Sequence, residues 1–225
     1  MPQRSWTLPP HVHAVMHDRD LVLLDLAADR YLCLPEALGV VRLDASRRGL
    51  EICDPGVAAE LRAERLLSAR TLGQISQSAA LAKHRPGTPA ASAVKLAYPP
   101  PEGRDLGRAL VVLLDAVRGY WRRPLGEILR RGLAGRPPVA DAPSPAMLQA
   151  VDSFHSWIPF APLPAKCLLR AFLLLRWLAR RGQGAHWVFG VATWPFRAHC
   201  WLQCGEVVLD DDAERVAAYS VILVL

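Results

Sequence analysis

Residues 167–203, CLLRAFLLLRWLARRGQGAHWVFGVATWPFRAHCWLQ, decide the fold of the second half of this chain. Apolar side chains dominate residues 167–181 over a length typical of a helix, and Gly182 ends the run. The pattern then changes to shorter β-prone runs over residues 186–193 and 199–203. A helix followed by successive strands predicts an α+β domain and not alternating βαβ units.

The flanking residues extend this pattern. Helices are predicted over residues 106–121, 125–133 and 147–157, and strands over residues 207–209 and 219–225. In the first of these helices apolar residues recur at helical spacing: Leu106, Leu110, Leu113, Leu114 and Val117. The C-terminal domain is therefore expected to contain helices followed by an antiparallel sheet.

The N-terminal residues predict a different arrangement. Three β-prone runs, residues 11–16, 21–26 and 30–34, are separated by polar turns, which indicates a three-stranded meander. Short helices are predicted over residues 36–44 and 57–67. Asp54 is placed to cap the second helix, and Pro55 fits its first turn. A small meander with short helices is typical of a winged-helix-like domain.

Composition separates the two halves. Ser, Ala, Gly and Pro dominate residues 74–103, which end near Pro99-Pro100-Pro101, as in a partly stiffened linker. We predict an N-terminal domain over residues 1–72, a linker over 73–103 and a C-terminal domain over 104–225. The predicted fold class is α+β.

Charge and hydropathy argue against several classes of function. The net charge is +6, but the basic residues are scattered and form no dense stripe, which argues against nucleic-acid binding. No apolar run is long and uncharged enough to span a bilayer, and residues 1–10 lack the apolar core of a secretory signal. Five irregularly spaced cysteines fit reduced thiols. We therefore expect a cytoplasmic protein without a membrane partner.

Cys167, His199 and Asp211 are the candidate catalytic residues. Cys167 begins the predicted helix, where the helix dipole favours a thiolate, although a cysteine in an apolar helix is also commonly core packing. His199 begins a predicted strand, and Asp211 follows in an acidic turn. A carboxylate there can accept one ring N–H of His199, but the spacing does not decide which aspartate of residues 210–212 does so. A half-buried structural histidine is an equally good interpretation of His199.

Strand alternation assigns the neighbours of His199 to two faces. His199, Trp201 and Gln203 share one face, so Cys200 and Cys204 are expected on the other, with Cys200 directed away from the site. His199, Cys200 and Cys204 could also be three ligands of a zinc site. A fourth ligand is not evident in the sequence, so we predict no metal.

Four motifs of the C-terminal half resemble the lasso-peptide B proteins, which are transglutaminase-like cysteine peptidases. They are CLLR (167–170), FGV (189–191), PFRAHCW (195–201) and VLDD (208–211), within a resemblance that begins near residue 147. The N-terminal motifs LVLLDL (21–26) and DRYLCL (29–34) are similar to the leader-recognition domain that accompanies these peptidases. One departure is Cys200, where a small residue such as alanine is usual.

The resemblance implies a leader peptidase. Its N-terminal domain would bind the leader of a ribosomal precursor peptide, and Cys167, His199 and Asp211 would cleave the leader from the core. An asparagine-synthetase-like cyclase is the implied partner, and no cofactor is expected in this chain. The leader is expected to add as a strand along residues 30–34, with the helix of residues 57–67 as the other wall. The leader-binding residues are then Tyr31, Leu32, Cys33, Leu34, Leu61, Arg62 and Arg65.

Three other interpretations stay open at this point. A transglutaminase-like acyl transferase would use the same cysteine with an amine in place of water. A non-catalytic peptide-binding adaptor would use only the N-terminal domain. A DNA-binding regulator would fit the winged-helix pattern, although a basic recognition helix is not evident.

Overall fold

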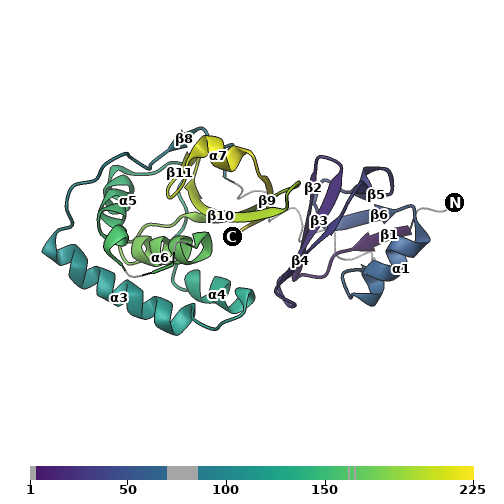
Figure 1. The fold of residues 1–225 in the computed structure, drawn as a ribbon, viewed down its shortest axis with the longest axis horizontal. Helices are drawn as coiled ribbons and strands as arrows, with labels where there is room; N and C mark the ends of the chain where they lie inside the picture. The colour runs from purple at the N-terminus through teal and green to yellow at the C-terminus, as the bar shows by residue number, and fades with distance from the viewer. Residues whose placement is uncertain (1–3, 70–85, 162, 165) are drawn as a thin grey trace. The chain divides into compact units, whose positions relative to one another are not determined.

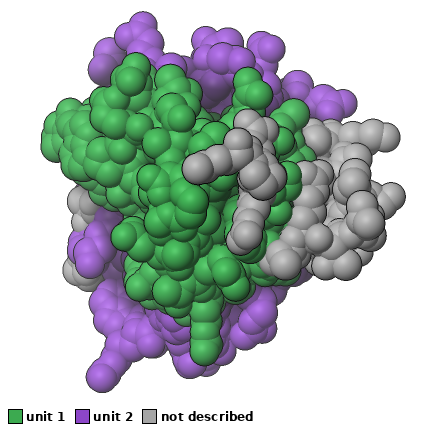
Figure 2. Space-filling view, turned by 90° about the vertical axis from the view of Figure 1, so that its right-hand side faces the viewer, with its two compact units in different colours: residues 1–85, 191–197, 220–223 green, residues 86–190, 198–219, 224–225 purple. Residues whose placement is uncertain are grey.

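The computed structural model describes residues 4–69, 86–161, 163–164 and 166–225, and its contacts divide the chain into two compact units. Unit 1 comprises residues 1–85, 191–197 and 220–223, and unit 2 comprises residues 86–190, 198–219 and 224–225 (Figure 2). Much of the predicted linker, residues 73–85, lies outside the described residues.

The predicted meander is present in unit 1. Strands β2 (Val12–His17), β3 (Asp20–Asp25) and β4 (Arg30–Leu34) form an antiparallel sheet in the order β2-β3-β4 (Figure 1). Asp18 and Asp29 adopt positive φ angles of 50° and 53° in the two turns. Aspartate tolerates this left-handed conformation better than most residues, which explains the tight polar turns.

A second sheet in unit 1 was not predicted. It contains β1 (Arg4–Thr7), β5 (Val41–Leu43), β6 (Gly49–Ile52) and β7 (Ser68–Ala69), in the order β5-β6-β1-β7. The prediction of a helix over residues 36–44 is wrong, because they form a 3-10 turn, Ala37–Gly39, and then strand β5. In the structure Val41 of β5 pairs with Ile52 of β6. The apolar run within residues 36–44 is too short for its pattern to distinguish a helix from a strand.

The remaining N-terminal helix is confirmed. Helix α1 (Pro55–Ala63) begins where the Asp54 side chain accepts hydrogen bonds from the N–H groups of Gly56 and Val57. It ends before the predicted residue 67, and Arg65 adopts a positive φ angle of 58°. Its buried side chains join a core that both sheets share: Trp6, Leu8, Val12, Leu21, Leu23, Leu50, Ile52, Ala58, Leu61 and Leu66.

The predicted helices of the C-terminal half are also confirmed, and they lie in unit 2. They are α3 (Gly103–Gly119), α4 (Leu125–Gly132), α5 (Pro145–Trp157) and α6 (Cys167–Ala179), with a 3-10 turn, Ile158–Phe160, after α5. Helix α6 contacts the other three (Figure 1). Its apolar side chains are buried on nearly every face, which explains why its sequence is almost continuously apolar.

The five-stranded sheet follows in the order β12-β9-β10-β11-β8. Its strands are β8 (Ala91–Ser92), β9 (His186–Ala192), β10 (Arg197–Cys204), β11 (Val207–Val208) and β12 (Ser220–Val224). Strand β10 pairs antiparallel with β11, while β8, from the predicted linker, pairs parallel with β11. A short helix, α7 (Ala213–Ala217), was not predicted. The fold is α+β, as predicted.

Candidate active site

Cys167 is the first residue of α6. Lys166 precedes it in an extended conformation, and no side chain caps the helix among the described residues. The first intrahelical bond runs from the N–H of Arg170 to the carbonyl of Lys166. The N–H groups of the first turn therefore carry the positive end of the helix dipole to the position of the sulfur.

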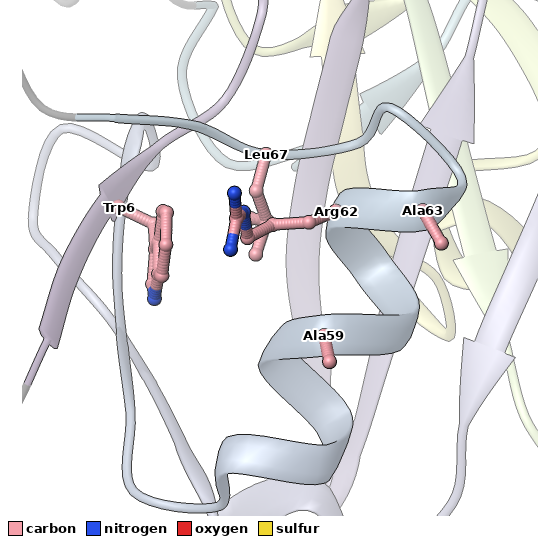
Figure 3. A pocket seen from close by; sticks show the side chains of 5 residues that line it. All are labelled: Trp6, Ala59, Arg62, Ala63 and Leu67. Carbon is pink, nitrogen blue, oxygen red and sulfur yellow. The ribbon is translucent and has the colours of Figure 1, made fainter.

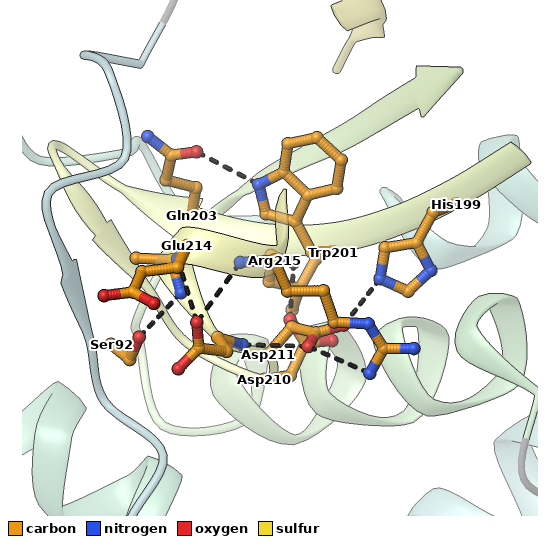
Figure 4. A network of polar contacts seen from close by, with 11 residues as sticks. Ser92, His199, Trp201, Gln203, Asp210, Asp211, Glu214 and Arg215 are labelled. Atoms are coloured by element: carbon orange, nitrogen blue, oxygen red, sulfur yellow. Dashed lines mark hydrogen bonds and ion pairs between the residues drawn. The ribbon is translucent and has the colours of Figure 1, made fainter. Parts of the chain in front are cut away.

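His199 extends from β10, and Asp211 fixes its ring. The Nε2 atom of His199 lies 2.5 Å from Oδ2 of Asp211, and both side chains are largely buried (Figure 4). The rings of Trp201 and Tyr219 flank the imidazole at centroid distances of 6.0 Å and 5.4 Å. The carboxylate and the two aromatic rings together hold one orientation of the imidazole.

The three consecutive aspartates have three different partners. Asp210 is buried and accepts the backbone N–H of Leu202 at 2.8 Å, while Asp211 binds His199. Asp212 caps α7 by accepting the N–H groups of Glu214 and Arg215 (Figure 4). The structure therefore answers the question that the sequence left open, because Asp211 alone of the three contacts the imidazole.

The sulfur of Cys167 is held as a thiolate. Its pKa falls to about 4, and the largest cause is a hydrogen bond with the Cys200 thiol. Burial raises the pKa, but hydrogen bonds from the His199 ring and from the backbone N–H of Cys200 lower it further. A thiolate is the nucleophilic form of cysteine. The sulfur is thus charged across the neutral pH range.

The imidazole of His199 carries the complementary charge. Burial alone lowers its pKa, but hydrogen bonds to Asp211 and Cys167 outweigh burial and raise it to about 9. The pKa of Asp211 stays below its usual value despite burial, because the carboxylate accepts from His199 and from the N–H of Asp212. Between about pH 4 and pH 9 the three groups form a thiolate, an imidazolium and a carboxylate.

Cys200 does not face away from this site, and that expectation was wrong. Strand alternation itself holds, since the Trp201 Nε1 donates to Gln203 Oε1 on the same face at 3.1 Å. The sulfur of Cys167, however, hydrogen-bonds to the His199 ring, the Cys200 thiol and the Cys200 backbone N–H, so it contacts side chains from both faces of β10. The sequence offered one signal for this, an unusual cysteine beside the histidine.

The predicted leader-binding residues lie on β4, on α1 and just after α1, all in unit 1. Tyr31, Leu32, Cys33 and Leu34 are half-buried on β4, which is an edge strand of the three-stranded sheet. Leu61 is only 4% exposed and belongs to the core, so its side chain is not offered to a ligand. Arg65 is exposed in the turn that follows α1.

Arg62 lines a pocket of about 530 Å³ between α1 and β1 with Trp6, Ala59, Ala63 and Leu67 (Figure 3). Its guanidinium carbon lies 5.2 Å from the centroid of the Trp6 ring. A cation over an aromatic face, beside small aliphatic side chains, makes one wall of this pocket amphipathic.

The cysteines that suggested zinc have other partners. Cys200 contacts Cys167, and the Cys204 thiol donates to the carbonyl of Ala140 at 3.3 Å. Within the described ranges, no cluster of three or more His, Cys, Asp or Glu residues is arranged to hold a metal ion. Nor is any described helix long and apolar enough to cross a membrane.

The chain belongs to the transglutaminase-like superfamily. The model of this family matches residues 110–224, which is about half of the chain and includes Cys167, His199 and Asp211. The superfamily includes cysteine peptidases and acyltransferases. Comparisons with curated proteins and with solved structures gave no match.

Proposed function

We propose that this protein is the leader peptidase of a lasso-peptide pathway. It binds the leader of a ribosomal precursor peptide and cleaves the bond between leader and core. The observation that carries the proposal is the partly buried series of Cys167, at the start of α6, His199 and Asp211. The N-terminal motifs that resemble a leader-recognition domain give the substrate class.

In the first step the Cys167 thiolate attacks the carbonyl carbon at the junction between leader and core. The carbonyl oxygen becomes an oxyanion, and the N–H of Cys167 at the start of α6 is the natural donor to it. The imidazolium of His199 then gives its proton to the leaving amine, which becomes the new N-terminus of the core. The leader stays on the sulfur as a thioester.

In the second step neutral His199 takes a proton from water, which attacks the thioester. The leader leaves with a free carboxylate, and Cys167 returns as a thiolate beside protonated His199. Asp211 stabilises the imidazolium before and after each turnover and fixes which ring nitrogen faces the sulfur. An acyl transferase would use an amine in place of this water.

The leader adds as a strand beside β4, which is an edge strand of the three-stranded sheet. Main-chain hydrogen bonds give affinity in this mode of recognition, and side-chain pockets give selectivity. Arg30, the first residue of β4, pairs with Glu64 at 2.6 Å, so the end of α1 lies beside the strand and forms a second wall. Tyr31, Leu32, Cys33 and Leu34 line the strand side, and Arg62 and Arg65 the helix side.

The released core has a free amino group. The resemblance implies that an asparagine-synthetase-like cyclase joins this amine to an acidic side chain of the core. That cyclase is the proposed protein partner, and any nucleotide-dependent step belongs to it.

The test is incubation of the purified protein with a candidate precursor encoded nearby, with and without the cyclase. Mass spectrometry should find a leader that has gained one water and a core with a free N-terminus. A leader joined to an added amine would indicate an acyl transferase. Processing that survives Cys167→Ala but needs residues 1–72 would indicate an adaptor and would contradict the proposed peptidase.

A further inference from the structure

His155 is a buried histidine on α5 that the proposed mechanism does not use. The residue is 3% exposed, and its ring has hydrogen-bond partners on two other segments. Nε2 lies 3.0 Å from the carbonyl oxygen of Leu209, and Nδ1 lies 3.0 Å from a guanidinium nitrogen of Arg170. The ring of Tyr98 stacks on the imidazole at a centroid distance of 5.2 Å. One side chain of α5 therefore bonds both to α6 and to the segment that follows β11.

The two partners fix the protonation of the His155 ring. A carbonyl oxygen only accepts hydrogen bonds, so Nε2 carries the proton that is donated to Leu209. A guanidinium only donates, so Nδ1 is unprotonated and accepts from Arg170. Burial is the main cause that lowers the pKa of His155 to about 4; the bond to Leu209 and the charge of Asp152 oppose it, and the charge of Arg170 adds to it. The imidazole is therefore neutral near pH 7.

Leu209 begins the segment that carries Asp211. Leu202 on β10 exchanges two hydrogen bonds with this segment: its carbonyl accepts the N–H of Leu209 at 2.9 Å, and its N–H donates to the Asp210 side chain at 2.8 Å. These bonds attach the segment to β10, and the bond from His155 attaches it to α5. Asp211 lies two residues after the attached carbonyl. The position of its carboxylate therefore depends on both attachments.

The bond from Arg170 extends this connection to the start of α6. Arg170 lies three residues after Cys167, in the first turn of the helix, and its backbone N–H makes the first intrahelical bond, to Lys166. Its side chain donates to His155, which in turn holds the carbonyl of Leu209. The same imidazole thus bonds to the two segments that bring the nucleophile and the carboxylate into the site.

We propose that His155 is a positioning residue, whose neutral imidazole fixes the segment of Asp211 relative to the first turn of α6, so that the carboxylate reaches His199. This inference rests on the proposed catalytic roles of Cys167, His199 and Asp211. His155 acts through the Leu209 carbonyl and not on the substrate. Without its N–H that carbonyl loses its donor, the segment shifts, and the bond that keeps His199 protonated weakens.

Two variants separate the hydrogen bonds of His155 from its packing. His155→Phe keeps a ring in the core and removes both bonds. His155→Gln loses the ring but keeps an N–H donor and an oxygen acceptor. The measurement is the titration of His199, followed by NMR of the ring C–H signals. Because the chain has seven histidines, the His199 signal is assigned by its loss in His199→Gln.

The wild-type pKa of His199 is about 9, since bonds to Asp211 and Cys167 outweigh burial, which lowers it. His155→Phe should lower this pKa by about one unit, because a weaker bond to the carboxylate favours the charged ring less. It should also lower kcat by about 10- to 100-fold and change KM by less than about 2-fold, as a small displacement of a catalytic group does. His155→Gln should restore most of both values.

His13→Phe is the matched control. His13 is a half-buried histidine on β2 in unit 1, and burial is the main cause that lowers its pKa to about 4 as well. The control therefore makes the same replacement at another neutral histidine, and it should leave kcat and the pKa of His199 at the wild-type values. If His155→Phe does not fold, His155→Met takes its place, because methionine matches the length of glutamine without its amide.

Three results would overturn the inference. They are an unchanged pKa of His199 in the folded variant that lacks both bonds, the same fall in His155→Gln, which would assign the effect to packing, and an equal fall in His13→Phe. The outcome is separable from the proposed function, because the titration needs no substrate. If the wild type cleaves no precursor while the pKa falls as expected, the positioning role stands and the peptidase fails. If the wild type cleaves a precursor and the pKa is unchanged, the peptidase stands and the role of His155 fails.

Discussion

The Nε2 atom of His199 and the Oδ2 atom of Asp211 lie 2.5 Å apart, although twelve positions separate the residues in the chain. The bond joins strand β10 to the turn that follows β11. Asp210 accepts a hydrogen bond from the N–H of Leu202, and Asp212 accepts one from the N–H of Glu214 at the start of α7. Asp211 is therefore the one aspartate of the three that bonds to the imidazole. This division of roles makes each aspartate testable on its own.

Asp211→Asn should lower kcat by roughly 1,000-fold or more, because the amide no longer stabilises the imidazolium and can favour the wrong tautomer. The measurement is the cleavage rate of a precursor at saturating concentration. Asp212→Asn is the control, since it changes only the cap of α7 and should cost about 1 kcal/mol of stability or less. Equal losses of activity in both variants would contradict the assignment of Asp211.

The rate should depend on pH as a bell. Activity requires the Cys167 thiolate and a protonated His199, whose pKa values are about 4 and about 9. As pH falls through about 4 the sulfur gains a proton and the rate falls; as pH rises through about 9 the ring loses its proton and the rate falls again. The profile of kcat/KM against pH checks this. A plateau that continues to high pH would show that the His199 proton is not used.

Gly190→Ala should reduce activity through the aromatic rings that flank His199. A Cβ atom at Gly190 would lie 2.7 Å from the Cβ of Tyr219 and 2.9 Å from the Trp201 ring, so both must shift. Gly107→Ala on α3 is the control, because nothing lies within 4 Å of its added Cβ and alanine favours a helix by up to about 1 kcal/mol. Gly190→Ala should therefore lower kcat, whereas Gly107→Ala should leave it unchanged. Equal kcat values in the two variants would contradict the claim that these aromatic rings hold His199 in place.

Arg62→Ala should weaken binding of the leader and leave the chemistry at Cys167 unchanged. The guanidinium lines the pocket beside Trp6, and its loss removes both a charge and a packed side chain. We expect Kd for a leader peptide to rise several-fold, while alkylation of Cys167 proceeds at the wild-type rate. Arg42→Ala removes the same charge from the exposed surface of β5 and should leave Kd unchanged. A similar rise in Kd for Arg42→Ala would indicate a general effect of charge.

Most elements could be predicted because their sequence patterns extend over many residues. The apolar run of α6, the strands β9 and β10 and the Asp54 cap of α1 are all visible as local patterns. The second sheet of unit 1 could not be predicted, since its strands have two to four residues and become recognisable only through their partners. Local patterns of that length do not separate strand from turn.

Side-chain placement was harder to predict than the elements. Helix α3 was expected from its spaced leucines, yet Leu106, Leu110 and Leu114 are exposed, and the smaller Ala109 and Ala116 are buried. Spacing indicates a helix but does not reveal which face its neighbours cover. The contact of Cys200 with Cys167 likewise depends on where the start of α6 meets β10, which is a tertiary relationship.

Intact-mass analysis of the enzyme, acid-quenched during turnover of a precursor, tests the central claim most directly. The account predicts an adduct with the mass of the leader acyl group, attached to Cys167, and no adduct in Cys167→Ala. Efficient cleavage with no adduct at any quench time, and with activity retained in Cys167→Ala, would contradict covalent catalysis by this cysteine.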